Sequence, residues 1–447
     1  MNELISKLII YNDFKDDTIL LDMADIVRKV KDGINNYYSD DKEDIQKQLY
    51  HCVRKILELG TSYGFDNNLW HNYLTFLLMN NENPFSLTCE KTGAGNGSVN
   101  LYAKNDFKIF MELFHYDFSK VETYLNTNVI SNLLNYKAIE KPELMYNVSV
   151  SKRVRKLSLA LSKAENEDDF FNLVTGFYKD YGVGMFGLNK AFRIVEKNES
   201  SEIVPISNMA DIRMDDLVGY EIQKKKLIDN TKAFVAGRRA NNVLLFGDSG
   251  TGKSTSIKAI INEFYDNGLR LIEIYKHQFK YLSSIIAQIK NRNYKFIIYM
   301  DDLSFEDFEI EYKYLKAIIE GGVEIKPDNI LIYATSNRRH IIKENWSDRN
   351  DVENENGMHR SDTMEEKLSL AYRFGERICY VKPSPNDFYN IVFTLAQRNN
   401  IQMDREKLRK EANKWELSHG GLSGRCAKQF IDYLLAMSED YERREER

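Results

Sequence analysis

Cysteines are few in this sequence and show no pattern. The four cysteines, Cys52, Cys89, Cys379 and Cys426, lie far apart, with no CxxC pair and no histidine at metal-ligand spacing. This distribution gives no sign of a metal site or of a disulfide framework. We therefore expect reduced core thiols in a reducing compartment.

Long apolar runs and an excess of basic residues are also missing. No run approaches the roughly 18 apolar residues of a membrane span, and the first residues, MNELISKLIIYNDFKDD, lack a basic leader and a long apolar core. The net charge of -5 and the sequence pI near 6.0 argue against a protein coated with basic surface for nucleic acid. We expect a cytoplasmic protein with no membrane partner.

The composition and the helical pattern of the first half indicate a globular protein of several domains. Hydrophobic residues at 43% and charged residues at 29% are globular values, and 447 residues suggest two or three domains. Residues 1–200 carry apolar residues at helical spacing, which predicts a mostly α-helical N-terminal domain that recognises a client or partner. The polar stretch 196–211, with one of only six prolines, predicts a linker.

After this stretch, short apolar runs alternate with helix-length segments. The five runs begin at Asn242, Leu269, Lys295, Asn329 and Arg377. This rhythm predicts an α/β domain over residues 201–383, with a five-stranded parallel sheet and crossover helices. From residue 384 to 447 the pattern is helical only, which predicts a small helical domain.

Two glycine strings match phosphate-binding patterns, but only one has the required context. GVGMFG, Gly182 to Gly187, follows a helical pattern instead of a strand, so we interpret it as a tight turn between helices. GDSGTGKS, Gly247 to Ser254, follows the apolar run NVLLF and precedes a helical segment, as a phosphate loop requires. We therefore predict a nucleotide site at the second string.

The residue types of this loop suit a bound triphosphate. Its glycines let the backbone wrap closely around phosphates, so that N–H groups and the positive end of a helix face negative charge. Lys253 can reach the β- and γ-phosphates, the Ser254 hydroxyl can ligate Mg²⁺, and Thr255 can contact the inner phosphate. The expected nucleotide contacts are Gly247, Asp248, Ser249, Gly250, Thr251, Gly252, Lys253, Ser254 and Thr255.

A second apolar run, KFIIYMDDLSFE, ends in two acids. A strand that ends in acid beside a phosphate loop predicts Asp301 in the Mg²⁺ shell and Asp302 facing the attacking water. The second acid is usually glutamate, and aspartate reaches less far, so we expect slow hydrolysis. Glu306 is an alternative base if the turn after Asp302 returns it to the attacking water, although a surface or capping role is favoured.

A further apolar run, NILIYATSNRRH, ends in polar residues, of which Asn337 can orient the water.

In this order, the motifs between residues 215 and 439 resemble those of the AAA+ ATPases. DDLVGYE is similar to the family's first segment, which implies Val218 and Gly219 near the adenine. EEKLSLAYRFGER resembles the element with the arginine finger, which implies Arg373 in that role. GGLSGR resembles the second sensor of the helical lid, which implies that Arg425 reaches the γ-phosphate. The resemblance implies ATP and Mg²⁺ as cofactors.

Other stretches resemble a narrower group. DDLSFE, NPFSLTCE and GVGMFGLNKAFR are similar to an uncharacterised bacterial AAA+ family, catalogued as domain of unknown function family 815. This resemblance covers most of the chain and implies a fold and a cofactor, but no substrate.

The arginine finger has a consequence for assembly. If Arg373 acts on a neighbour's nucleotide, a lone subunit is nearly idle, so we predict an ATP-dependent ring or open spiral of identical subunits. The alternative is a monomer in which Arg373 pairs with a local carboxylate. Relatives that share the paired aspartates include replication initiators and helicase loaders, for which ATP is more an assembly signal than a fuel.

Three functions remain open from the sequence. The first is an ATPase that couples slow hydrolysis to remodelling of a macromolecular client, and the second is an ATP-gated switch or loader with little turnover. A small-molecule kinase shares the phosphate loop but gives no reason for Arg373 or Arg425. The client can be protein or nucleic acid. The basic stretch SKRVRK, Ser151 to Lys156, could touch nucleic acid, but the solvent-exposed face of a helix is the favoured interpretation. The polar segment 344–364 is predicted to be a surface loop.

Overall fold

The computed structural model describes the protein over residues 1–13, 18–35, 42–139, 148–197, 200–206, 209–304, 311–320, 327–337, 370 and 372–445. Two compact units divide the chain. The first comprises Met1–Asn189 and Pro205–Met209, and the second comprises Lys190–Val204 and Ala210–Arg447. Within the described ranges, no helix is both long and apolar enough to cross a membrane. All four cysteines are free thiols, of which Cys52, Cys89 and Cys426 are buried and Cys379 is partly exposed.

The first unit is built from helices around a central one. Nine of the twelve residues of α4 are buried, because this helix is apolar on almost every side. It contacts α3, α6, α8, α9 and α11, and the Trp70 indole N–H donates to the carbonyl oxygen of Leu113 at 2.9 Å. The helices are α1 (Asn2–Ile5), α2 (Ile19–Asn35), α3 (Lys42–Tyr63), α4 (Leu69–Asn80), α5 (Pro84–Thr92), α6 (Val99–Phe114), α7 (Ser119–Leu125), α8 (Val129–Leu134), α9 (Val148–Leu161), α10 (Glu167–Tyr181) and α11 (Gly184–Leu188).

The string GVGMFG is a turn between two of these helices. Gly182 ends α10 with φ of 80°, and α11 begins two residues later at Gly184. A helix, not a strand, precedes the string, so the context of a phosphate-binding loop is missing and the predicted helix–helix turn is confirmed.

The second unit contains a seven-stranded sheet with the order β2-β1-β4-β5-β6-β3-β7. The five predicted strands are all present, but the predicted count of five is wrong. Of the two further strands, β2 lies inside the stretch in which a linker was predicted, and β1 ends there. β2 is a mostly exposed edge strand and β1 is buried only in its first half, so neither carries a continuous apolar run as the predicted strands do. The strands are β1 (Ala191–Lys197), β2 (Ser200–Pro205), β3 (Val243–Gly247), β4 (Leu269–Glu273), β5 (Lys295–Met300), β6 (Ile330–Ser336) and β7 (Glu376–Tyr380).

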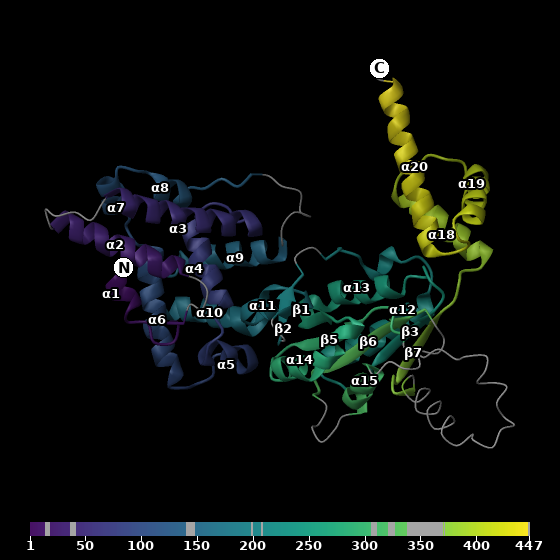
Figure 1. Cartoon of the computed structure of the whole chain (residues 1–447), viewed down its shortest axis with the longest axis horizontal. Helices are drawn as coiled ribbons and strands as arrows, with labels where there is room; N and C mark the ends of the chain where they lie inside the picture. The colour runs from purple at the N-terminus through teal and green to yellow at the C-terminus, as the bar shows by residue number, and fades with distance from the viewer. Residues whose placement is uncertain are drawn as a thin grey trace. The chain divides into compact units, whose positions relative to one another are not determined.

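The pairing from β1 to β7 is parallel throughout. Because parallel strands need crossover connections, helices follow most of them. Figure 1 shows α12 and α13 over one face of the sheet and α14 and α15 over the other. These helices are α12 (Glu221–Val235), α13 (Lys253–Phe264), α14 (Leu282–Ile289) and α15 (Glu311–Glu320), and short 3₁₀ turns lie at η2 (Met214–Asp216), η3 (Tyr265–Asn267) and η4 (Lys276–Tyr281).

The strand register determines which residues meet at the carboxyl edge of the sheet. Phe246 pairs with Ser336, and Met300 pairs with Ala334. The loop that follows β3, the acids that follow β5 and the polar end of β6 therefore lie side by side. This edge carries the site described below.

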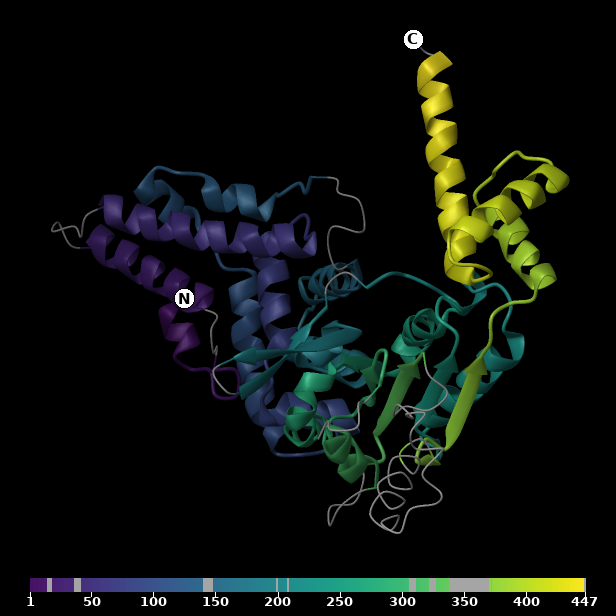
Figure 2. The same ribbon diagram turned by 45° about the vertical axis from the view of Figure 1, so that its right-hand side comes forward.

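Three helices at the end of the chain form a small body that we call the lid. They are α18 (Pro385–Arg398), α19 (Arg405–Ser418) and α20 (Gly424–Glu445), and Figure 2 shows them packed on one another. Phe388 and Val392 of α18, Ala412 of α19 and Phe430 of α20 form an apolar core of their own. The lid thus has its own hydrophobic support beside the sheet.

Candidate functional site

The loop between β3 and α13 has the backbone that phosphate binding requires. Gly247, Gly250 and Gly252 have φ values of 126°, 75° and 94°, a region that residues with a side chain rarely occupy. α13 begins immediately after Gly252, so its first N–H groups face the concave side of the loop. The backbone of the loop therefore has the shape of a cradle for an anion.

Gly247 also makes a close approach to β7. A Cβ atom at this position would lie 2.1 Å from the carbonyl oxygen of Tyr380, much closer than atoms can pack. The next residue completes the contact: the Asp248 N–H donates to the same oxygen at 2.9 Å, and its carboxylate accepts from the Lys382 N–H at 2.8 Å. The start of the phosphate loop is thus tied to the strand that leads to the lid.

Alanine at Gly247 should destabilise the chain far more than alanine at Gly237. Gly237 has a similar positive φ of 72° but no atom within 4 Å of an added Cβ. We expect Gly237→Ala to cost about 1 kcal/mol for the backbone conformation alone. Gly247→Ala should lower the free energy of unfolding by about 3 kcal/mol or more, because the Tyr380 clash adds to that cost. Urea titration of both full-length variants measures the difference, and equal midpoints would contradict the close approach.

Lys253 lies at the centre of the cradle. Its side chain is buried, and Nζ donates to the carbonyl oxygens of Gly247 at 3.0 Å and Asp248 at 2.7 Å, and to Asn337 Oδ1 at 2.9 Å. Burial lowers the pKa of the ammonium, while the nearby carboxylates of Asp248, Asp302 and Asp301 act in the opposite direction. The ammonium is thus a cation held inside a loop shaped for an anion.

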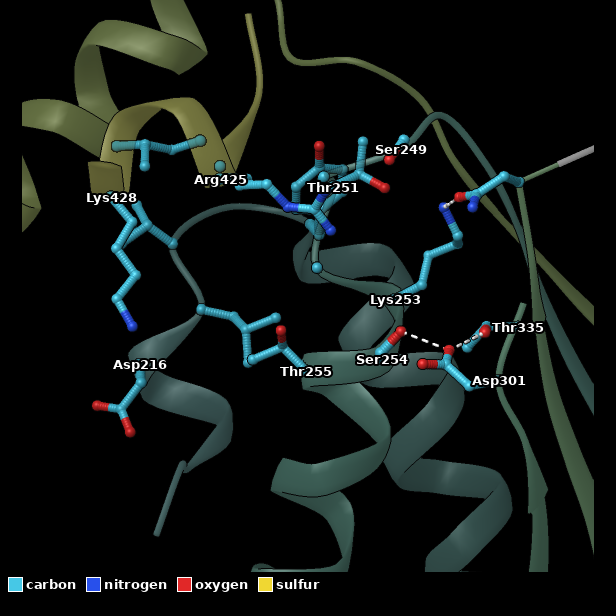
Figure 3. Close-up of a pocket in the computed structure, with 18 of the residues that line it drawn as sticks. Asp216, Ser249, Thr251, Lys253, Ser254, Thr255, Asp301, Thr335, Arg425 and Lys428 are labelled. Atoms are coloured by element: carbon cyan, nitrogen blue, oxygen red, sulfur yellow. Dashed lines mark hydrogen bonds between the residues drawn. The ribbon is translucent and has the colours of Figure 1, made fainter. Parts of the chain in front are cut away.

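Asp301 joins the phosphate loop to the end of β6. Its Oδ1 accepts from the Ser254 hydroxyl at 2.8 Å and from the Thr335 hydroxyl at 2.5 Å, as Figure 3 shows. Burial alone would raise the pKa of this carboxyl, but the hydrogen bonds that it accepts, among them those from Thr335 and Ser254, outweigh burial and lower it. A carboxylate beside a hydroxyl supplies the hard oxygen ligands that Mg²⁺ prefers. These residues therefore fit the expected metal.

Asp302 has an unusual backbone conformation. Its φ is 50°, in the left-handed region where Asp and Asn are tolerated better than other residues with side chains. Its Oδ1 accepts from Asn337 Nδ2 at 2.8 Å, so the two candidate water-orienting residues are in contact. Aspartate therefore suits this position in two ways: this residue type tolerates the left-handed backbone, and its carboxylate reaches the Asn337 amide. Glu306, the alternative base, lies outside the described residues.

A cavity of about 620 Å³ extends from the phosphate loop to the lid. Of the residues predicted to contact nucleotide, metal or water, it brings together Val218, Ser249, Gly250, Thr251, Gly252, Lys253, Ser254, Thr255, Asp301, Asp302, Asn337 and Arg425. Gly219, Gly247 and Asp248 do not line it. Leu217, Ile391 and Leu395 add apolar wall to this cavity, the kind of surface on which a purine base can pack.

The lid contacts the phosphate loop directly. The Arg425 N–H donates to the carbonyl oxygen of Gly250 at 3.1 Å, and a Cβ on Gly250 would meet Ser423 Oγ at 3.1 Å. Arg398 of α18 donates to the carbonyl oxygens of Asp215 and Asp216 at 2.6 and 3.0 Å. The lid is therefore attached to both ends of the cavity.

Lys428 is a lining residue that sequence reasoning missed. It lies on the lid side of the cavity, three positions after Arg425 in α20 (Figure 3). Residues three apart share one face of a helix, so this spacing was the available signal. The lid contributes two cations to the cavity in place of the one expected.

Arg373 lies away from this cavity. Its N–H donates to the carbonyl oxygen of Leu370, just before β7 begins at Glu376. β7 runs parallel to β3, with Glu376 beside Val243 and Tyr380 beside Gly247. The phosphate loop follows one end of these strands and Arg373 precedes the other, so about 16 Å of strand separates them. The structure does not bring Arg373 to the phosphate loop of its own chain.

Two sequence candidates remain. The segment 344–364 lies outside the described residues. In SKRVRK, Arg153 donates to the Gly187 carbonyl oxygen at 2.9 Å, which is a structural role. Across the described ranges, no group of three or more His, Cys, Asp or Glu residues could hold a metal ion.

These features define a class. The parts of a P-loop protein of the AAA+ class are all present: a phosphate loop between β3 and α13, acids after β5, a polar end of β6 and a helical lid over the loop. The chain belongs to the family described as "Protein of unknown function (DUF815)", whose profile matches residues 188–438.

Comparisons with individual proteins add little. No curated protein matches the chain. Among solved structures, the chain is similar to two mutant forms of RuvB from Thermotoga maritima, with TM-scores of 0.35 and 0.36 and identities of 14% and 15%. The matches cover 52% of this chain and 66% and 67% of the two RuvB chains. Such values carry no inference about function.

Proposed function

We propose that this protein is an ATPase that binds ATP with Mg²⁺ and hydrolyses it slowly, so that nucleotide state controls self-assembly and remodelling of a macromolecular client. One observation carries the proposal: a single cavity beneath the lid brings together Lys253, Ser254, Asp301, Asp302 and Asn337. A cation, a metal-ligand pair and a water-orienting pair are the groups that phosphoryl transfer to water requires.

Each of these residues has a separate task. The loop N–H groups and Lys253 bind the phosphates, while Ser254 and Asp301 would hold Mg²⁺. When bound, Mg²⁺ would neutralise charge on the β- and γ-phosphate oxygens. Asp302 accepts a proton from the attacking water, and Asn337 orients the carboxylate through its 2.8 Å hydrogen bond. Arg425 adds positive charge from the lid.

The position of Arg373 supports assembly. An arginine at the opposite edge of the sheet cannot serve its own nucleotide, so a role for Arg373 in hydrolysis requires the nucleotide of a neighbouring copy. We therefore propose a ring or open spiral of identical subunits, formed when ATP is bound. Residues 1–200 are proposed to recognise the client, which is protein or nucleic acid. The cytoplasmic location remains an expectation from the sequence.

The second candidate is an ATP-gated switch or loader with little turnover. The contact between Asp302 and Asn337 favours it, because a short acid already engaged by an amide is a weak base for water. Steady-state phosphate release separates the two functions. Strong stimulation by a client supports the remodelling ATPase, whereas slow unstimulated turnover with tightly retained ATP supports the switch.

Replacement of Asp302 by Glu should raise turnover by about tenfold if the short side chain limits the rate, since a general base contributes about 10²- to 10⁴-fold and a longer one recovers part of it. The left-handed backbone makes Glu about 1 kcal/mol less favourable at this position, so thermal unfolding is measured alongside phosphate release. Asp302→Asn, which suits the same backbone, is the matched variant without a base. If Asp302→Glu leaves turnover unchanged, the side-chain length was never the limit.

A further inference from the structure

Thr335 lies where β6 meets the two acids. Its side chain is only 2% exposed, and the residue before it, Ala334, pairs with Met300 at the end of β5. Thr335 is therefore beside Asp301, at the point where the chain leaves the sheet. A buried hydroxyl at this place must have hydrogen-bond partners, because burial without them is costly.

Three hydrogen bonds connect Thr335 to three successive residues. Its Oγ1 donates to Asp301 Oδ1 at 2.5 Å and accepts from the Asp302 N–H at 2.9 Å. Its carbonyl oxygen accepts from the Leu303 N–H at 2.7 Å. The whole turn that carries both acids is thus attached to one residue of the neighbouring strand.

The direction of these bonds follows from elementary chemistry. A backbone N–H can only donate, so the Asp302 amide uses a lone pair of the Thr335 oxygen. The hydroxyl has a single proton, and that proton is directed at the Asp301 carboxylate. Asp301 Oδ1 also accepts from Ser254, so two hydroxyls from two sides determine the orientation of the carboxylate.

We propose that Thr335 is a positioning residue for the metal site: its hydroxyl orients Asp301 toward the cation and, through the Asp302 N–H, maintains the left-handed turn that presents the second acid. This inference rests on the proposed function, because it assigns Thr335 a task in holding Mg²⁺ with the nucleotide. A residue that only fills space would not need the hydroxyl. Valine has nearly the same shape as threonine but can neither donate nor accept.

The test compares nucleotide binding with and without the metal. A fluorescent non-hydrolysable ATP analogue is titrated into full-length protein in EDTA, and then with increasing Mg²⁺. We expect Thr335→Val to need about 10- to 100-fold more Mg²⁺ for half-maximal enhancement, the usual effect of losing a partner of a metal ligand. Its affinity for the analogue in EDTA should stay within about twofold of the original chain, because Thr335 acts through the carboxylate that faces the metal.

Two further variants make the test specific. Thr335→Ser retains the hydroxyl, so its Mg²⁺ requirement should lie within about threefold of that of the original chain. Thr231→Val is the matched control, since Thr231 is also fully buried and hydrogen-bonded, to Tyr333 Oη and the Leu227 carbonyl oxygen, but lies outside the cavity. It should leave the Mg²⁺ requirement unchanged. If Thr335→Val does not fold, Thr335→Ala carries the same expectation.

Three results would overturn the proposal. The first is an unchanged Mg²⁺ requirement in folded Thr335→Val or Thr335→Ala. The second is a loss of affinity that is equally large in EDTA, which would make Thr335 a purely structural residue. The third is impairment of Thr335→Ser to the level of Thr335→Val. If the original chain binds no analogue under any condition, the proposed function fails as well, and this outcome differs from the other three.

Discussion

Alanine at Arg373 is expected to lower ATP turnover by about 10³- to 10⁵-fold while leaving ATP affinity nearly unchanged, the effect of removing an arginine supplied from outside the site. The expectation follows from the strand direction. Arg373 precedes β7, and the phosphate loop follows the parallel neighbour β3, so the two lie at opposite edges of one sheet. An arginine there can stabilise transition-state charge only in another subunit.

A mixing experiment tests this geometry directly. Arg373→Ala leaves its own cavity intact, and Asp302→Asn lacks the base but keeps its arginine. Each variant alone should be inactive. A productive interface needs a cavity from an Arg373→Ala subunit and an arginine from an Asp302→Asn neighbour. Random assembly of an equal mixture forms this pairing at about one interface in four, so about a quarter of the turnover of the original chain should return. No recovery on mixing, with assembly intact, would show that the arginine does not act between subunits.

The neighbouring arginine provides the control. Arg377 is exposed in β7, and its guanidinium lies over the Tyr372 ring at 4.8 Å. Arg377→Ala should lose this contact, worth about 0.5–1 kcal/mol at an exposed site, and leave turnover within about threefold. If Arg377→Ala is inactive and Arg373→Ala is active, the assignment of the finger is wrong.

Alanine at Lys253 is expected to weaken ATP binding by about 10³-fold. An ammonium about 4 Å from a phosphate charge contributes about 4 kcal/mol at the effective dielectric constant of a partly buried site, and each 1.4 kcal/mol corresponds to about tenfold in affinity. Lys253 is 6% exposed and is held by two loop carbonyl oxygens, so its charge is positioned before the nucleotide arrives. Isothermal titration with Mg²⁺ and ATP measures the loss.

Lys258 is the matched control for this change. It lies in the same helix, α13, five positions further on, and is exposed to solvent. Lys258→Ala should bind ATP as the original chain does, because a solvated surface charge contributes little. A comparable loss of affinity in both variants would point to general damage to α13 instead of a lost phosphate contact.

Much of the site was readable from the sequence because its signals are local. The phosphate loop needs glycines, a lysine and a hydroxyl at fixed spacing, and the turn and helix start that they form depend on neighbouring residues only. The five strands from β3 to β7 were readable as apolar runs because both faces of a parallel sheet are covered. Asp301 and Asp302 could be predicted because they are the first two residues after such a run.

Other features escaped prediction because their signals are not local. β2 is a mostly exposed edge strand and β1 is buried only in its first half, so neither has a long apolar run. The left-handed conformation of Asp302 depends on partners from β6, and Lys428 becomes a lining residue only because the lid lies over the phosphate loop. None of these features can be predicted from the residues that are adjacent in the sequence.

The sequence by itself determined the kind of chemistry available: a phosphate cradle, a cation, a hydroxyl, two acids and an amide, each at the end of its own strand or loop. The tertiary structure alone decided which of them touch. Thr335 reaches Asp301 across 34 positions of the chain, and Arg373 is kept from Lys253 by the parallel direction of β3 and β7. Strand order and register set these distances, and they result from packing of the whole sheet, which no single segment encodes.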